Sequence, residues 1–236
     1  MSHDFKLVQP RWIAAMAIML CAGTASAAVG PVYSGTYVDM YLKPNTFPSP
    51  LTEEMVFLDA GQAATITGHV GSQTDTRLVS FSSTTDTLDA ANGFATIKAV
   101  DGYLNNITIT APGYWFEDLI FSVNLATNAN DDLHITATDK SGGTDIYASW
   151  TSLGNWVNGQ NDILVLSKGT NLMQSITIDS QNGLLELGAC SEATCGIDQI
   201  KQIQISGVTP VPEADTYAML LAGLGLIGFA VRRKLN

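Results

Sequence analysis

The sequence has 236 residues, of which 46% are hydrophobic, 8% aromatic and 14% charged. Between residues 28 and 210 there are 6 basic and 19 acidic side chains, a net charge of −13. Nucleic acid is excluded as a partner, because binding to the phosphate backbone depends on cationic side chains. Three cysteines are too few for a disulfide-dense miniprotein. A body rich in Gly, Ser, Thr, Asn and Asp excludes a coiled coil or a helical bundle and indicates an all-β fold.

Residues 1–27 have the layout of a secretory signal peptide. Lys6 and Arg11 form a basic n-region, Ile13–Ala22 is an apolar stretch, and Ala25-Ser26-Ala27 is a small-x-small cleavage site. The apolar stretch extends about 15 Å as a helix, roughly half of a hydrocarbon core, so it is too short for a transmembrane helix. We expect an N-terminal signal helix that engages the Sec translocon and is removed by signal peptidase after Ala27.

Short β-rich segments separated by turn residues fill residues 28–210. Isoleucine alternates with polar residues in Ile107–Thr110, Ile176–Asp179 and Ile203–Ser206, as in half-buried antiparallel strands. Asp139–Gly143 and Gln181–Gly183 suit hairpin turns. The predicted strands are Leu78–Phe81, Gly93–Val100, Leu104–Thr110, Phe116–Leu125, Leu133–Thr138, Asp145–Trp150, Asp162–Ser167, Ser175–Ser180, Gly183–Leu187 and Ile200–Ser206. This pattern predicts one domain with an antiparallel β-sandwich, jelly-roll-like fold.

Oxygen-bearing side chains gather in several predicted turns. Asp86 and Asp89 precede one predicted strand, and Asp101 follows it. Ca²⁺ binds oxygen ligands of this kind and often bridges loops. Aspartate also caps turns without any metal. Two interpretations stay open: a calcium site at Asp86, Asp89 and Asp101, or a protein without a cofactor.

No sequence motif of the body defines a catalytic centre. The G-x-S-x-G elbow, H-E-x-x-H, the Walker A loop and the dinucleotide fingerprint are all absent. Glu117 and Asp118, with Asp162 or Glu186 opposite, suggest a carboxylate pair for glycoside hydrolysis. However, adjacent residues of a strand point to opposite faces. We predict that the protein is not an enzyme, with a glycan-active hydrolase as the weaker alternative.

Trp150 and Trp156 flank a polar segment, and Asn158 and Gln160 follow shortly after Trp156. Exposed aromatic rings beside amide side chains are suited to sugar recognition, so this pair is a candidate glycan platform. Tryptophans buried in a β core give the same pattern. The sequence therefore leaves open a carbohydrate-binding module and ordinary core packing.

Cys190 and Cys195 are the cysteines that stay after removal of the signal. In an oxidising compartment a pair at this spacing favours a disulfide that closes a small loop. Zinc is the alternative, but the only histidines of the body are His69 and His134.

Residues 211–236 form a distinct C-terminal segment. Val211, Pro212, Glu213 and Ala214 precede the uncharged stretch Tyr217–Val231, which is followed by the basic residues Arg232, Arg233 and Lys234. Fifteen helical residues extend about 22 Å, enough for a short transmembrane helix, and the basic residues should stay cytoplasmic. The body would then lie outside the membrane.

The Pro-Glu motif, the Gly- and Leu-rich stretch and the terminal basic residues, in this order, resemble the PEP-CTERM sorting signal of Gram-negative bacteria. The resemblance covers residues 211–234, with Ala214 where the family most often has proline. It implies recognition by an exosortase, a membrane Cys-dependent transpeptidase-like enzyme, and association with exopolysaccharide and biofilm. Asp86–Leu125 and Ile200–Gly207 also resemble the extracellular β-sandwich of many such proteins.

The sequence therefore predicts an exported protein, tethered to the inner membrane as a precursor and then transferred to the cell surface or matrix. Its partners would be the Sec translocon, signal peptidase, the exosortase, the membrane and exopolysaccharide. A structural or adhesive matrix component is the first hypothesis for the body.

Overall fold

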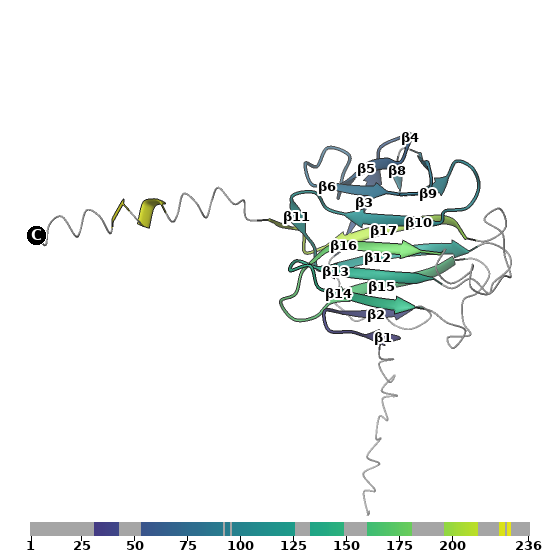
Figure 1. Cartoon of the computed structure of the whole chain (residues 1–236). Coiled ribbons are helices and arrows are strands. Elements are labelled where there is room, and N and C mark those ends of the chain that lie inside the picture. The colour runs from purple at the N-terminus through teal and green to yellow at the C-terminus, as the bar shows by residue number, and fades with distance from the viewer. Residues whose placement is uncertain are drawn as a thin grey trace, which may run out of the picture.

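The computed structural model describes residues 31–42, 53–91, 93–94, 96–125, 133–148, 160–180, 196–211, 222–224 and 226–227. The described residues between 31 and 211 form an all-β body (Figure 1). Its strands are β1 (Tyr33–Ser34), β2 (Val38–Leu42), β3 (Glu54–Leu58), β4 (Gly61–Ala63), β5 (Thr65–Val70), β6 (Leu78–Ser82), β7 (Leu88–Ala90), β8 (Gly93–Phe94), β9 (Thr96–Ala99), β10 (Asn106–Thr110), β11 (Tyr114–Trp115), β12 (Asp118–Leu125), β13 (His134–Asp139), β14 (Thr144–Ala148), β15 (Gln160–Ser167), β16 (Met173–Asp179), β17 (Ile197–Ser206) and β18 (Thr209–Pro210).

All but two of these strands belong to one curled antiparallel sheet. Its order is β1-β2-β15-β12-β17-β3-β5-β6-β10-β16-β13-β14, with β4, β7, β8 and β9 paired beside this path. β3 connects the two halves, since Met55 pairs with Gln204 of β17 and Leu58 pairs with Gly68 of β5. The predicted all-β antiparallel class is confirmed. Because the strands run as one continuous sheet, the two separate sheets of a β-sandwich stay a prediction.

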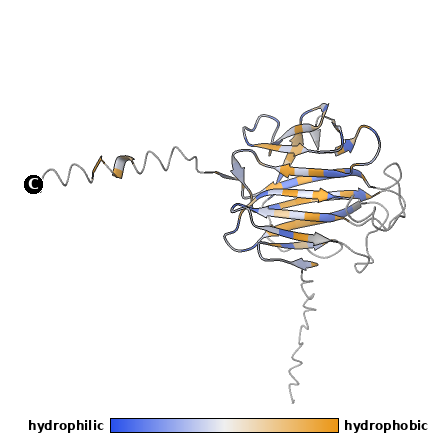
Figure 2. Cartoon of the chain, in the orientation of Figure 1, coloured by the Kyte–Doolittle hydropathy of each residue, from blue (hydrophilic) through white to orange (hydrophobic). Residues whose placement is uncertain are grey.

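Alternation of apolar and polar residues explains which face of each strand is buried. In β2, Val38, Met40 and Leu42 are buried while Asp39 and Tyr41 are partly exposed. The predicted alternation in β10 and β16 is confirmed, with the isoleucines of both strands fully buried. Figure 2 shows the same mixture of hydrophobic and hydrophilic residues along the strands. The inward faces form one hydrophobic core that holds the curled sheet together.

The two ends of the strand order are joined by one carboxylate. Asp145 of β14 is 6% exposed. Its oxygens accept hydrogen bonds from the backbone N–H groups of Thr36 at 3.0 Å, Tyr37 at 2.5 Å and Val38 at 2.9 Å. These amides lie at the start of β2, so Asp145 connects β14 to the opposite end of the sheet. A side chain at Gly35 would collide with this carboxylate, which explains glycine there.

Arg77 stabilises the start of β3. Its guanidinium donates to Glu54 Oε1 at 2.6 Å and Oε2 at 2.9 Å, and to Asp75 Oδ2 at 2.7 Å. These hydrogen bonds lower the pKa of Asp75 to about 2 and also lower the pKa of Glu54. Arg77 is the only arginine between residues 28 and 210, so no other arginine of the body can form these ion pairs with Glu54 and Asp75.

Nine predicted strands overlap observed ones, although Ala95, Ser149 and Trp150 within them lie outside the described residues. The tenth, Gly183–Leu187, lies wholly outside the described residues. The predicted turn at Asp139–Gly143 is confirmed, because it joins β13 to β14 and the Asp139 N–H donates to the Gly143 carbonyl at 2.8 Å. The turn at Gln181–Gly183 is outside the described residues. The prediction missed β1 to β5, β7, β11 and β18.

The missed strands include one with a glycine at its centre. Gly68 of β5 lies against β3, and a side chain there would come within 2.9 Å of the Phe57 carbonyl oxygen. Glycine weakens a strand pattern in the sequence, but here it permits close packing.

The predicted signal helix at residues 1–27 and most of the predicted C-terminal helix lie outside the described residues. Residues 222–224 and 226–227 are helical. Within the described ranges, no helix combines the length and apolarity needed to cross a membrane.

Candidate functional site

The body ends beside the predicted sorting segment. β17 pairs with β12, β3 and β9 and ends at Ser206. Gly207 then turns the chain with a φ of 61°, and a side chain there would collide with Glu117. Glycine is therefore required both for the turn and for the close contact. Val208 packs against the core before the chain leaves the sheet.

Strands β11 and β18 form a separate two-stranded sheet at this exit. Tyr114 pairs with Pro210, and Trp115 pairs with Thr209. The Val211 N–H donates to the Gly113 carbonyl at 2.9 Å. Both β18 residues are exposed, so the pairing buries little surface. Val211, the first residue of the predicted sorting motif, is thus attached to the body.

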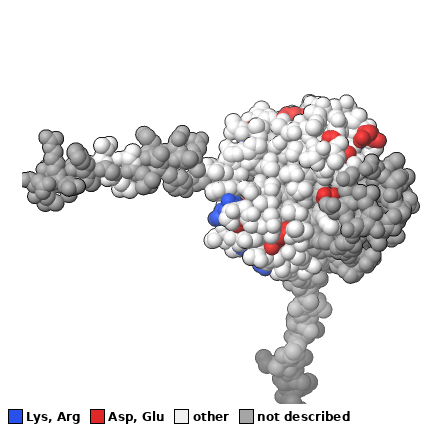
Figure 3. All heavy atoms as spheres, viewed as in Figure 1, with Lys and Arg blue, Asp and Glu red and all other residues white. Residues whose placement is uncertain are grey.

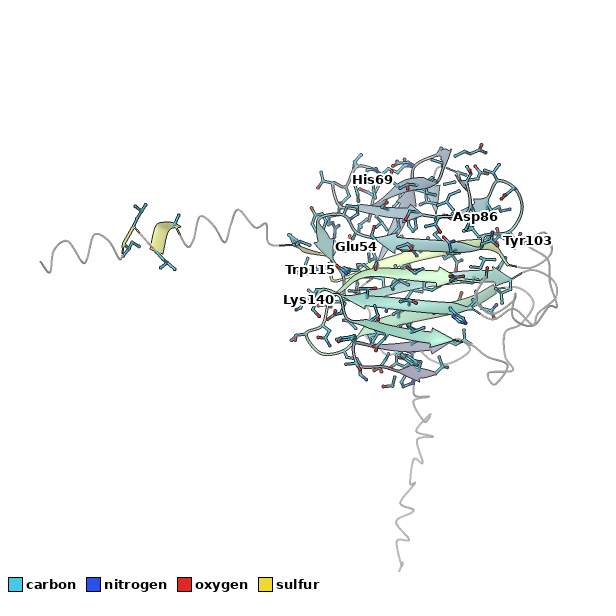
Figure 4. All side chains as sticks on the ribbon, viewed as in Figure 1. Glu54, His69, Asp86, Tyr103, Trp115 and Lys140 are labelled. Atoms are coloured by element: carbon cyan, nitrogen blue, oxygen red, sulfur yellow. The ribbon has the colours of Figure 1, made fainter. Side chains whose placement is uncertain are left out.

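A Pro-Gly turn places β11 beside β18. The Tyr114 N–H donates to the Ala111 carbonyl at 2.9 Å, and Gly113 has a φ of 79°. The ammonium group of Lys140 lies 6.0 Å from the centre of the Trp115 ring, within the range of a cation–π contact. Figure 4 shows both side chains at the edge of the body where β11 lies. Figure 3 shows a small basic patch on the same edge.

Asp118 of β12 is a buried carboxyl group that lies opposite Ser206, the last residue of β17. It is 4% exposed, and the Ser206 hydroxyl donates to its Oδ2 at 2.5 Å. Its Oδ1 is also buried and has no hydrogen-bond partner among the described residues. Burial, together with the nearby charges of Glu53 and Glu117, raises the pKa of Asp118 to about 6. The group therefore changes charge near neutral pH.

The carboxylates named for glycoside hydrolysis do not face one another. Glu117 is exposed and Asp118 is buried, as expected for adjacent residues of a strand. Asp162 is opposite Ser122, four residues along β12 from Asp118. Four residues span about 13 Å, whereas paired catalytic carboxyls lie about 5 to 9.5 Å apart. Glu186 lies outside the described residues.

Asp86 is saturated by protein donors. Its carboxylate accepts hydrogen bonds from the hydroxyls of Ser83 and Thr85 and from the backbone N–H and the side-chain amide of Asn105, at 2.8 to 3.1 Å. Asp89 accepts from the Gln62 amide at 3.1 Å, and Asp101 is exposed. In the described part of the chain, no group of three or more His, Cys, Asp or Glu side chains is placed to hold a metal. This arrangement gives the calcium hypothesis no support.

Asp86→Asn should lower the free energy of unfolding by about 1–2 kcal/mol, because an amide cannot accept all four hydrogen bonds. We expect the same loss in EDTA and in millimolar Ca²⁺, measured by urea denaturation. A loss seen only with Ca²⁺ present would instead identify Asp86 as a metal ligand. Asp101→Asn is the matched control and should change stability little, since Asp101 is exposed.

Several predicted site residues lie outside the described residues. These are Trp150 and Trp156 of the glycan platform, Cys190 and Cys195 of the disulfide, Pro212, Glu213 and Ala214 of the sorting motif, and Arg232, Arg233 and Lys234 of the basic end. The zinc alternative involved the two histidines of the body. His69 donates through Nδ1 to the Asp75 carbonyl at 2.6 Å. His134 lies in β13. The sequence interpretation did not find Asp145 or the β11–β18 pairing, because both depend on contacts between distant segments.

Comparison with known families identifies the C-terminal segment. Residues 210–234 match the PEP-CTERM protein-sorting motif. The resemblance inferred from residues 211–234 is therefore confirmed, and the motif indicates an exported protein sorted by an exosortase. No curated protein and no solved structure matches the chain.

Proposed function

We propose that this chain is a non-catalytic surface protein that an exosortase processes through residues 210–234 and that associates with exopolysaccharide outside a Gram-negative cell. The match of these residues to the PEP-CTERM motif is the observation that carries the proposal. The signal-like residues 1–27 support export through the Sec translocon. The body, with its single hydrophobic core, is the part that would be displayed, and its curled sheet is compatible with a jelly-roll-like β-sandwich.

The proposed processing step is an acyl transfer near Pro212 to Ala214. The enzyme thiolate attacks the carbonyl carbon of the scissile peptide bond, and the amine of the C-terminal fragment leaves with a proton. A thioester then joins the body to the enzyme. Water or an amine of an acceptor displaces the thiolate, which leaves the body with a free carboxyl group or an amide bond to that acceptor.

The acidity of the body supports a role in a matrix. A net charge of −13 between residues 28 and 210 keeps a protein soluble and attracts divalent ions, which can bridge it to an anionic polysaccharide. A carbohydrate-binding surface at Trp150 and Trp156 is a narrower form of the same proposal. It predicts saturable glycan binding that Trp150→Ala or Trp156→Ala removes.

Deletion of residues 211–236 should leave the body folded but abolish its retention at the cell surface, because the body core lies outside this segment. We would measure the amount of protein in membrane, surface and medium fractions by immunoblotting, and the mass of each species. The full-length protein should lose both residues 1–27 and a C-terminal fragment. A double variant, Pro212→Ala with Glu213→Gln, keeps the apolar stretch and should accumulate as the unprocessed membrane precursor.

Two results would contradict the proposal. One is equal surface retention of the truncated and full-length proteins. The other is a mature protein whose mass still includes residues 212–236. The same mass measurement after alkylation without reductant reports whether Cys190 and Cys195 form the predicted disulfide.

A further inference from the structure

We infer that β11 holds the residues before the sorting motif on the body, and that β18 must separate from β11 before the exosortase can bind its substrate. This inference rests on the proposed function. The hydrogen bond from the Val211 N–H to the Gly113 carbonyl, at 2.9 Å, attaches the first residue of the motif to the end of β11. Pro212 and Glu213 follow at once, so the sequence provides no linker between the body and the motif.

The register of the pairing defines its hydrogen bonds. In an antiparallel ladder, bonded and non-bonded pairs alternate. Because Val211 donates to Gly113, Thr209 and Trp115 form the next bonded pair, and Tyr114 and Pro210 form the non-bonded pair between them. Proline has no N–H to donate, so Pro210 suits this position. The segment from Thr209 to Val211 is therefore held in an extended conformation.

The β11 side of the pair is firmly fixed. Phe116, the next residue after β11, is fully buried and exchanges two backbone hydrogen bonds with Met173, at 3.0 and 2.8 Å. Tyr114 packs against the core, and Lys140 lies over the Trp115 ring. β18 has none of this support, since Thr209 and Pro210 are both exposed. Opening would therefore move β18 and leave β11 in place.

An enzyme that binds its substrate as an added β-strand forms hydrogen bonds with the backbone groups of that extended segment. Here the backbone groups just before the motif are already paired with β11. The closed state therefore competes with the enzyme, and the apparent affinity falls in proportion to the open fraction. Val208 packs against the core. The residues after Val208 can therefore separate from β11 without unfolding the body.

A disulfide between Tyr114→Cys and Pro210→Cys tests the inference. Non-bonded antiparallel pairs have Cα atoms about 4.5 Å apart, which fits disulfide geometry. The matched control joins Thr138→Cys to Thr144→Cys, a pair in the β13–β14 hairpin. Purified full-length precursors would be oxidised, placed in liposomes, and mixed with membranes that contain the exosortase. Formation of the mature protein would be followed by immunoblotting and mass spectrometry.

The oxidised crosslink between positions 114 and 210 should slow cleavage at least tenfold relative to the reduced form of the same double variant. The hairpin control should be cleaved at the wild-type rate in both redox states. Each single variant should be cleaved equally fast under oxidising and reducing conditions, which separates any effect of the Pro210 substitution itself from the effect of the crosslink. Equal cleavage of the oxidised and reduced double variant would overturn the inference while leaving the proposed function intact. Failure of the exosortase to cleave the wild-type precursor would instead overturn the proposed function and, with it, this inference.

A second variant tests the opposite direction. Thr209→Pro removes the N–H of the bonded pair and lies just outside the matched motif, residues 210–234. It should raise the cleavage rate several-fold, whereas Thr209→Ala keeps the N–H and should not. A slower Thr209→Pro variant, or an equal rise in Thr209→Ala, would count against release of β18 as a required step.

Discussion

Asp145→Ala should lower the free energy of unfolding by about 2–4 kcal/mol, because three backbone N–H groups, of which that of Val38 is buried and the other two are partly buried, lose one charged acceptor together. The affected amides, those of Thr36, Tyr37 and Val38, begin β2, and Asp145 is the hydrogen-bonded connection from them to β14. Urea denaturation of the body, monitored by circular dichroism and tryptophan fluorescence, would measure the loss. Weakening this connection also frees the edges of β1 and β14, so we expect increased aggregation.

Two substitutions separate the hydrogen bonds of Asp145 from other effects. Thr144→Ala changes an exposed neighbour on the same strand and should cost less than about 1 kcal/mol. Asp145→Asn keeps the size of the side chain but has a single acceptor oxygen, so it should fall between the wild type and Asp145→Ala. If Asp145→Ala costs no more than Thr144→Ala, the carboxylate does not hold the ends of the sheet together.

The all-β class could be predicted because alternation is a local property of the sequence. Strands such as β10 and β16 show isoleucine at every second position, and the structure buries those isoleucines. The same signal was present in Val38, Met40 and Leu42, yet β2 was missed because a single short segment gives no indication of its partner. β5 was missed because Gly68 interrupts its apolar pattern, although that glycine serves close packing against β3.

The path of the sheet could not be predicted, because register and neighbour order depend on contacts between distant residues. β3 pairs with β17 at one end and with β5 at the other, and no local pattern distinguishes such a strand from an ordinary one. The sorting segment was predicted from residues 211–234, since its parts are contiguous. Its attachment through Gly113 and Val211 joins positions almost a hundred residues apart and appears only in the fold.

Asp118→Asn should raise the free energy of unfolding at pH 7.5 by about 1–2 kcal/mol and change it little at pH 4. The pKa of Asp118 is about 6 in the folded protein, raised from 3.8 chiefly by burial. Below pH 3.8 the group is protonated in both states, and its contribution to stability is fully present. As the pH rises through 6, the folded protein must carry a buried carboxylate, and that contribution is lost. An amide stays neutral and avoids this loss.

The hydroxyl of Ser206 provides the control for this pH dependence. It donates to Asp118 Oδ2 and so favours the charged carboxylate, which opposes the effect of burial. Ser206→Ala should therefore raise the pKa of Asp118 further and destabilise the body more at pH 7.5 than at pH 4. In the Asp118→Asn background the same substitution should have an effect independent of pH, as a double-mutant cycle would reveal. A constant difference between wild type and Asp118→Asn from pH 4 to 7.5 would contradict the raised pKa and assign the carboxyl a purely steric role.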